Sequence, residues 1–285
     1  MKIEFLKSIA LSFILISKSG FACAPVEDSS RITAAGGSIT EILYSINAEK
    51  KIVAVDITSY HPEEATSHPS IGYVRTLSAE GILSLNPTLI IGEDDMGPPT
   101  VINQIKRTGI DVSIIPEEHS AEGIINKINC IGNIIGMKEE SQKFIKSKIL
   151  PKIKELNQYS IKNTKEKKKV IFILGLQSGS PIIGGLNTSA DGFIKMIGGI
   201  NSMNEFENWK PVSAESIISS EPDVILVTAR GLNAFGNIQA LKNHPSLSLT
   251  PAVKNNTIYS MDGMAMLGFS PRTLDSAIKI SKKIN

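Results

Sequence analysis

The sequence predicts an α/β fold of two similar lobes with mainly parallel sheets, joined by one long helix, with a ligand cleft between the lobes. Apolar runs of strand length alternate with amphipathic helical stretches along most of the chain. The stretch LSAEGILSLNPTLIIG at 77–92 has a relative, VSAESIISSEPDVILV, at 212–227. A long helical stretch lies between the two copies. A unit that occurs on each side of a helical connector indicates two lobes of the same kind.

The first residues of the chain differ in character from the rest. The whole chain has 285 residues, 41% of them hydrophobic and 20% charged, as in soluble globular proteins with a sizeable core. At its start, Lys2 and Lys7 are followed by an apolar run at 9–16 and then by small residues. This pattern predicts a secretory signal peptide over 1–24. The run is far shorter than the roughly 20 apolar residues that span a membrane.

Two cleavage positions fit this leader. Cleavage after Ala22 would leave Cys23 first and would suit a lipid anchor there, although Gly20 stands where lipid-modified proteins carry Leu or a similar residue. Cleavage after Ala24 follows the rule of small residues but places Pro25 next. The sequence leaves both positions open, and with them a lipid anchor at Cys23.

Charge and cysteine content exclude some classes of function. Without its first 22 residues, which hold three Lys and one Glu, the chain's 30 basic and 28 acidic side chains become 27 of each. A neutral chain gives no support for nucleic-acid binding. Cys130 lies among apolar residues at helical spacing, which favours a buried helix thiol over a reactive one. We therefore expect neither a disulfide framework nor a cysteine metal motif.

The N-terminal lobe is predicted over 25–137. Within the first copy of the repeat, Ser78 is placed to cap a helix, and Glu80 lies in the first turn, where the helix dipole favours an anion. Pro87 then ends the helical pattern before an apolar strand. The strands expected in this lobe are at 31–35, 51–56, 88–92 and 111–116, with helices at 36–46, after the third strand, and around Cys130.

The linking helix is predicted over 138–163, with a bend at Pro151, and the C-terminal lobe over 164–285. In the second copy, Ser213 and Glu215 repeat the capping and first-turn positions. The other elements expected here are strands at 169–176, 223–227 and 257–262 and helices at 190–199 and 271–284. Open α/β sheets bind ligands at the carboxyl ends of their strands, which indicates the cleft between the lobes.

Four stretches of the chain resemble a known family: RITAAGGSITEIL, IGYVRTLSAEG, PVSAESIISSEPDVILVTARGL and MDGMAMLGFSPRT. They are similar to the haemin-binding periplasmic proteins of bacterial haem ABC importers, within a wider helix-linked class that also serves cobalamin and ferric siderophores. The resemblance covers nearly the whole chain after the leader. It implies a periplasmic, monomeric protein that is no enzyme. Such a protein carries haem b as its transported ligand to an inner-membrane ABC permease dimer with its ATPase.

The resemblance implies that Tyr73 is the ligand of the haem iron. A phenolate is a hard, anionic oxygen donor that suits ferric iron, and bonding to the cation removes the phenol proton. If the segment is extended, Arg75 points to the same side as Tyr73 and can hydrogen-bond the phenolate oxygen. Without the resemblance, Tyr73 would read as a half-buried loop aromatic with Arg75 paired to a surface acid.

Further residues are candidates for supporting the haem. Met264 or Met266 could approach its second face, and Arg230, just past a strand end, could pair with a propionate. Gln177 stands where some members of the family have a histidine ligand. The alternatives are an apolar cleft wall for the methionines and a surface role for Arg230. None of the four histidines, at 61, 68, 119 and 244, pairs with another at metal-site spacing.

In this family each lobe presents one Glu to Arg residues of the permease, and Glu80 and Glu215 match those positions. Both residues would also stabilise their helix N-termini without any partner. Two rival functions remain. The same fold could bind a ferric siderophore or cobalamin, or an α/β enzyme could use the cleft for a nucleotide. The enzyme is disfavoured because the glycine-rich turns, including Gly36 and Gly37, spell no phosphate-binding signature and no nucleophile–base pair is evident.

Overall fold

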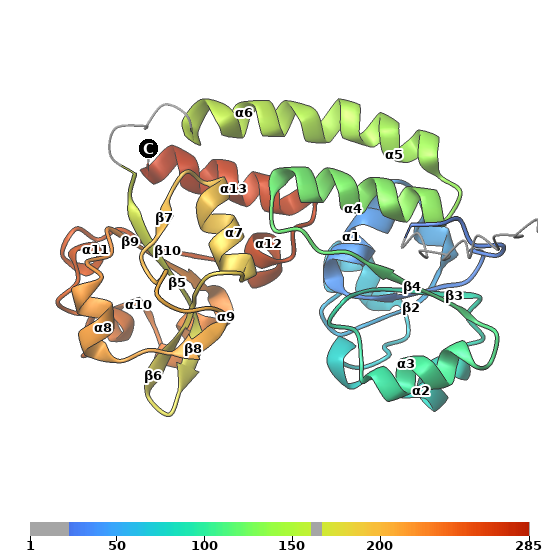
Figure 1. The fold of residues 1–285 in the computed structure, drawn as a ribbon, viewed down its shortest axis with the longest axis horizontal. Coiled ribbons are helices and arrows are strands. Elements are labelled where there is room, and N and C mark those ends of the chain that lie inside the picture. The colour runs from blue at the N-terminus through green and yellow to red at the C-terminus, as the bar shows by residue number, and fades with distance from the viewer. Residues whose placement is uncertain (1–22, 161–166, 285) are drawn as a thin grey trace, which may run out of the picture.

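A computed structural model describes residues 23–160 and 167–284. The predicted signal peptide, apart from its last two residues, and the predicted end of the linking helix lie outside the described residues. Figure 1 shows two sheets side by side, with a long helical segment running across the top of both. This arrangement of two α/β lobes around separate sheets is the predicted one.

The N-terminal lobe contains a fully parallel sheet of strand order β2-β1-β3-β4. In Figure 1, α1 and α4 cover its upper face and α2 and α3 its lower face. Because both faces are covered, the two central strands, β1 and β3, are almost uniformly apolar and buried. The elements are β1 (Ile32–Ala35), α1 (Gly37–Ser45), η1 (Glu49–Lys51), β2 (Ile52–Val55), η2 (Glu63–Ser67), η3 (Val74–Thr76), α2 (Ala79–Leu83), β3 (Leu89–Glu93), α3 (Pro99–Lys106), β4 (Asp111–Ile115) and α4 (Ala121–Ile134).

The C-terminal lobe contains a mixed sheet of order β10-β9-β5-β6-β8, with β7 also paired to β5. Strands β10, β9, β5 and β7 are parallel, whereas β6 and β8 run antiparallel to their neighbours. The elements are β5 (Lys169–Gln177), β6 (Ser180–Gly184), α7 (Ser189–Met196), β7 (Ile200–Asn201), β8 (Trp209–Pro211), α8 (Ala214–Ser219), β9 (Val224–Thr228), α9 (Ala229–Phe235), α10 (Ile238–Lys242), α11 (Pro251–Lys254), β10 (Ile258–Met261), α12 (Gly263–Leu267) and α13 (Pro271–Ile284).

The repeated unit has the same local structure in both lobes. The Ser78 hydroxyl accepts a hydrogen bond from the Gly81 amide at 3.3 Å, and the Ser213 hydroxyl accepts one from the Ser216 amide at 3.2 Å. Each Ser therefore satisfies one exposed amide at the start of its helix, as predicted. In each copy the short helix ends before the proline, and a buried strand follows.

The linking segment is one helical run made of α5 (Lys138–Phe144), the π-helical turn η4 (Ile145–Ile149) and α6 (Leu150–Ser160). The π turn directly precedes Pro151, whose ring displaces the carbonyl four residues earlier and which donates no hydrogen bond. The predicted irregularity at Pro151 thus takes the form of a widened turn. Lys152 of α6 contacts Asp275 of α13 at 2.7 Å, which fastens the linking helix to the closing helix.

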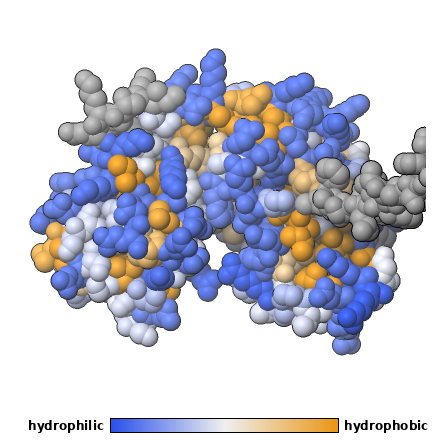
Figure 2. Space-filling view, in the orientation of Figure 1, coloured by the Kyte–Doolittle hydropathy of each residue, from blue (hydrophilic) through white to orange (hydrophobic). Residues whose placement is uncertain are grey.

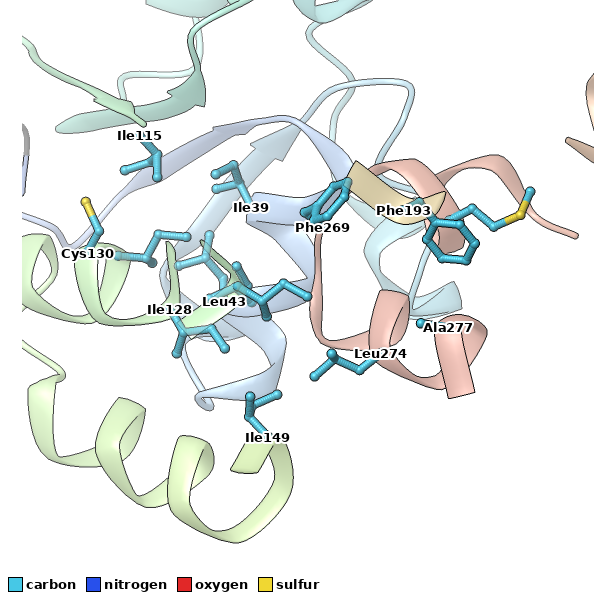
Figure 3. Packing of buried hydrophobic residues seen from close by; sticks show 14 of the residues in the cluster. Ile39, Leu43, Ile115, Ile128, Cys130, Ile149, Phe193, Phe269, Leu274 and Ala277 are labelled. Carbon is cyan, nitrogen blue, oxygen red and sulfur yellow. The ribbon is translucent and has the colours of Figure 1, made fainter. Parts of the chain in front are cut away.

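One hydrophobic cluster runs through both lobes. Figure 3 shows Ile39 and Leu43 of α1 in the same cluster as Phe269 and Leu274 from the end of the chain. These four side chains have no exposed surface. Because a close-packed core resists deformation, the shared cluster holds the two sheets at a set relative orientation.

The two cysteines form a disulfide, which corrects the expectation of a free Cys130 thiol and no disulfide. Cys23 and Cys130 are 107 residues apart in sequence, but their Cα atoms are only 4.8 Å apart. The N-terminal segment runs along the end of α4, where the Val26 amide donates to the Ile134 carbonyl at 3.1 Å. No local sequence pattern indicates a pairing between such distant residues. The spacing of apolar residues around Cys130 predicts that the residue is buried, but not that it has a partner.

Candidate functional site

The carboxyl ends of the two sheets face each other. Tyr60 follows β2 and Asp262 follows β10, and the Tyr60 hydroxyl donates to the Asp262 carboxylate across the lobes at 2.8 Å. Gly37, after β1, lies against Met264 of the other lobe, since a Cβ atom at Gly37 would be 3.1 Å from the Met264 Cε. Below these contacts the lobes separate, and Figure 2 shows a notch between them at the bottom of the view.

Apolar side chains are exposed on the N-terminal side of this edge. Tyr73 is 37% exposed and Ile57 is 61% exposed. The two segments are joined because the Ile57 amide donates to the carbonyl of Gly72 at 2.9 Å. Gly72 has a φ of +81°, a left-handed conformation that glycine adopts without steric cost. A large aromatic and a large aliphatic side chain left partly in water at a cleft edge can bind an apolar ligand face.

The geometry around Tyr73 differs from the extended segment that the sequence analysis assumed. Tyr73 directly precedes η3 and makes no side-chain cap hydrogen bond, and Arg75 lies inside that 3₁₀ turn. The Arg75 guanidinium carbon is nevertheless 6.0 Å from the centroid of the Tyr73 ring. Arg75 Nε also donates to the Asp95 carboxylate at 2.8 Å. Asp95, from the loop after β3, is a neighbour of the site that sequence reasoning did not find.

The phenol groups near the cleft are not equivalent. Burial, the hydrogen bond to Asp262 and the charge of Asp262 raise the pKa of Tyr60 to about 12. Its hydroxyl is therefore held as a donor. Within residues 23–160 and 167–284, no group hydrogen-bonds the Tyr73 hydroxyl. Tyr73 is thus the phenol beside the cleft whose oxygen is available, with an arginine next to its ring.

The other predicted support residues lie in the second lobe, at different depths. Arg230 is an exposed residue in the first turn of α9, directly after β9. Gln177 is the last residue of β5 and pairs with Ser180 in the hairpin to β6. Met264 is half-buried in α12, whereas Met266 has no exposed surface and belongs to the core. Among the described residues, no hydrogen bond, ion pair or ring contact joins any of these four side chains to Tyr73.

Glu80 and Glu215 are both exposed in the first turns of α2 and α8, the equivalent helices of the two lobes. Within the described parts of the chain, neither carboxylate has an ion-pair partner. Glu215 also borders a groove of about 480 Å³ between α8 and the segment before β8, lined by Phe206 and Lys210 among others. The two carboxylates are therefore free to meet cations of another molecule.

A buried cluster of charges lies at the junction of the lobes, and sequence reasoning missed it. Lys127 of α4 has no exposed side-chain surface, and its ammonium group donates to Glu93 at 2.5 Å and Glu117 at 3.0 Å. It also donates to the Gly268 carbonyl of the other lobe at 3.2 Å and to the Ser38 hydroxyl at 3.3 Å. The cluster is fully hydrogen-bonded, as a buried cation requires.

The pKa values of the two carboxyl groups in this cluster are shifted in opposite directions. Burial raises the pKa of Glu93, and the attraction of Lys127 does not offset it. Burial would raise the pKa of Glu117 too, but hydrogen bonds from His119 and Lys127 and the charge of Lys127 lower it to about 2. The single cation therefore favours ionised Glu117 over ionised Glu93.

A second charged group joins the lobes beside the first. Arg272, at the start of α13, donates to the Glu41 carboxylate of α1 at 2.7 Å, and the Ser270 hydroxyl donates to the same carboxylate at 2.6 Å. Arg272 also lies 3.2 Å from Asp262, which holds Tyr60. These contacts and the shared core hold the site between two lobes in a constant arrangement.

The described residues contain no group of three or more His, Cys, Asp or Glu side chains that could hold a bare metal ion. In the part of the chain that the structure describes, no helix is both long enough and apolar enough to cross a membrane.

Two similar α/β lobes, a linking helix and a cleft at the carboxyl ends of both sheets define a solute-binding protein. The family model described as periplasmic binding protein matches residues 32–265, and the chain belongs to that family. Among solved structures, the periplasmic heme-binding protein RhuT from Roseiflexus sp. RS-1 has a TM-score of 0.83 and 32% identity, covering 90% of this chain and 98% of RhuT.

A second structure, the periplasmic heme-binding protein HutB of Vibrio cholerae, has a TM-score of 0.80 and 34% identity, covering 90% of this chain and 99% of HutB. Among curated relatives, the vitamin B12-binding protein of Vibrio parahaemolyticus is 26% identical over 271 residues, which is 94% of this chain and 92% of that protein. The fold and the family resemblance are thereby confirmed.

Proposed function

We propose that this protein binds haem in the periplasm and delivers it to an inner-membrane ABC importer for iron acquisition. The observation that carries the proposal is the Tyr73 phenol, 37% exposed at the cleft edge with its hydroxyl unpaired and Arg75 beside its ring. Haem-binding proteins are the solved structures to which the chain is similar at 32% and 34% identity. We expect the protein to act as a monomer and to catalyse no reaction.

Tyr73 would bind ferric haem iron through its phenolate oxygen. Iron takes the place of the phenol proton, and the positive guanidinium of Arg75 favours the anionic oxygen. Arg75 Nε donates to the Asp95 carboxylate at 2.8 Å. That carboxylate therefore orients the arginine, but it also competes with the Tyr73 oxygen for the N–H donors of the guanidinium. Ile57 and Met264 would contact the porphyrin, while Arg230 and Gln177 are candidates for polar contacts from the second lobe.

Glu80 and Glu215 would dock the loaded protein on a permease dimer with its ATPase. Two exposed carboxylates, one on each lobe, suit two cationic sites related by the symmetry of a dimer. Such contacts supply orientation and a faster encounter more than affinity. The shared core keeps the two carboxylates at a constant separation, which two-point docking requires.

Cobalamin is the second candidate ligand, because a vitamin B12-binding relative covers 94% of the chain. In that case Tyr73 would be a wall residue. Titration of the purified protein with haemin, cyanocobalamin and a ferric hydroxamate, followed by absorbance, separates the candidates. A Soret band that saturates with haemin, with no binding of the other two, is expected. Saturable binding of cyanocobalamin without a haemin signal would replace the proposal.

Docking is tested with Glu80→Ala and Glu215→Ala in a strain that depends on haem as its iron source. We expect both variants to bind haemin as the wild type does and to lose growth on haem. Glu139→Ala is the matched control, since Glu139 is also exposed in the first turn of a helix. Equal growth of all three variants would rule out docking through Glu80 and Glu215.

A further inference from the structure

We infer that Cys23 stays in the mature protein as the disulfide partner of Cys130, so the leader is cut before Cys23 and no lipid is attached there. The protein would then diffuse freely in the periplasm. This inference uses the predicted signal peptide and does not depend on which ligand the cleft binds.

The N-terminal segment is built into the N-terminal lobe. Cys23 packs against the main hydrophobic cluster, and its partner Cys130 is only 4% exposed on α4. The Val26 amide donates to the Ile134 carbonyl at 3.1 Å, and the Ser29 hydroxyl donates to the Ile135 carbonyl at 3.2 Å. The disulfide is thus the first of several contacts that fix this segment along α4.

The disulfide and a lipid anchor exclude each other chemically. Lipid modification joins a diacylglycerol to the sulfur of the first cysteine by a thioether bond, and that needs a free thiol. In the disulfide, the Cys23 sulfur is bonded to the Cys130 sulfur instead. The two thiols lose two protons and two electrons, which pass by thiol–disulfide exchange to an oxidised protein disulfide of the export compartment. Disulfides persist in the periplasm, where the leader would direct the chain.

The same pairing distinguishes the two cleavage positions that the sequence left open. Cleavage after Ala24 would remove Cys23 and leave a single buried thiol at Cys130. Cleavage after Ala22 retains Cys23 and permits the disulfide. Gly20, where a lipid-modified protein has Leu or a similar residue, is consistent with cleavage by the ordinary signal peptidase.

The test is to express the full chain with its own leader in a Gram-negative host. Osmotic shock should release it without detergent, and its intact mass should correspond to a chain that starts at Cys23 and lacks two hydrogen atoms. Alkylation in denaturant should label no cysteine before reduction and two after it. Peptide mapping without reductant should find Cys23 linked to Cys130.

Cys130→Ser is the control variant, and it should gain one cysteine that alkylates without reduction. A mass increased by acyl chains, a requirement for detergent, or a mature chain without Cys23 would each overturn the inference. Labelling of wild-type cysteines before reduction would do the same. The haemin titration is a separate measurement on the same preparation, so a failure of haem binding leaves this result unaffected.

Discussion

Replacement of Lys127 by Met should destabilise the protein strongly. The side chain is fully buried, and its single ammonium group contacts Glu93 at 2.5 Å and Glu117 at 3.0 Å. Methionine has a similar length but no charge, so both carboxylates would remain buried without a cation. Removing one partner of a buried ion pair costs about 3–5 kcal/mol.

Protonation of a carboxylate left without its cation would cost a similar free energy. A carboxyl with a pKa of about 4.3 takes a proton at pH 7 at a cost of about 3.7 kcal/mol. The expected loss of about 3–5 kcal/mol corresponds to a fall in Tm of about 6–20 °C for a chain of this size. Protonation becomes less costly as the pH falls, so the deficit of the variant should be smaller at pH 5 than at pH 7.

The assay is urea unfolding followed by circular dichroism at both pH values, with Lys152→Met as the matched control. Lys152 pairs with Asp275 at 2.7 Å, but its side chain is 32% exposed, and such surface pairs contribute about 0–1 kcal/mol. If the two variants lose equal stability at pH 7, Lys127 does not hold a buried charge cluster. A deficit that grows towards pH 5 would contradict the reasoning as well.

Three other outcomes are expected. Glu117→Gln should be less stable than the wild type at neutral pH, and this difference should disappear as the pH falls from about 4.5 to about 2. The reason is that a carboxylate with a lowered pKa stabilises the folded state only while it is ionised. A stability difference that stays constant over this pH range would contradict the assignment. Arg75→Ala should weaken haemin binding about 10–100-fold and shift the absorbance of the complex, and Arg107→Ala, also an exposed arginine, should do neither. Reduction of the disulfide between Cys23 and Cys130 should lower the free energy of unfolding, followed by calorimetry, by about 2–5 kcal/mol, because the bond joins residues that are 107 apart in sequence. An unchanged unfolding transition would show that the bond adds no stability.

The elements with a regular apolar period were predictable from the sequence. The closing helix was expected at 271–284 and lies at Pro271–Ile284. The capping roles of Ser78 and Ser213 also followed from the repeat, because a helix start is a local event that a single side chain can satisfy. The same repeat indicated two lobes, and the structure has two separate sheets.

Features that depend on distant partners could not be predicted. Residues 180–184 form the strand β6, which pairs antiparallel with β5. Ser178 and Gly179, with left-handed φ values of 49° and 82°, make the tight turn between the two strands. Lys127 reads as a polar residue of an amphipathic helix, since its partners Glu93 and Gly268 lie 34 and 141 residues away. The pairing of Cys23 with Cys130 has the same cause.

Within the candidate site, the sequence indicated Tyr73 and Arg75 but not how they are held. The segment turns into η3 instead of extending, because its backbone bonds to the loop after β3: the Gly97 amide donates to the Val74 carbonyl at 3.0 Å. That loop also carries Asp95, which takes the Arg75 side chain. Neither contact could be predicted from the residues adjacent to Tyr73 in the sequence.

The central claim is that the Tyr73 oxygen binds the haem iron, and it is tested most directly by titrating haemin into wild type and Tyr73→Phe. Phenylalanine keeps the ring and removes only the oxygen. The account predicts a saturable Soret band for the wild type and, for the variant, a displaced band with affinity lowered by more than the roughly 10–100-fold typical of residues that only support a ligand. Identical spectra and equal affinities for the two proteins would contradict it.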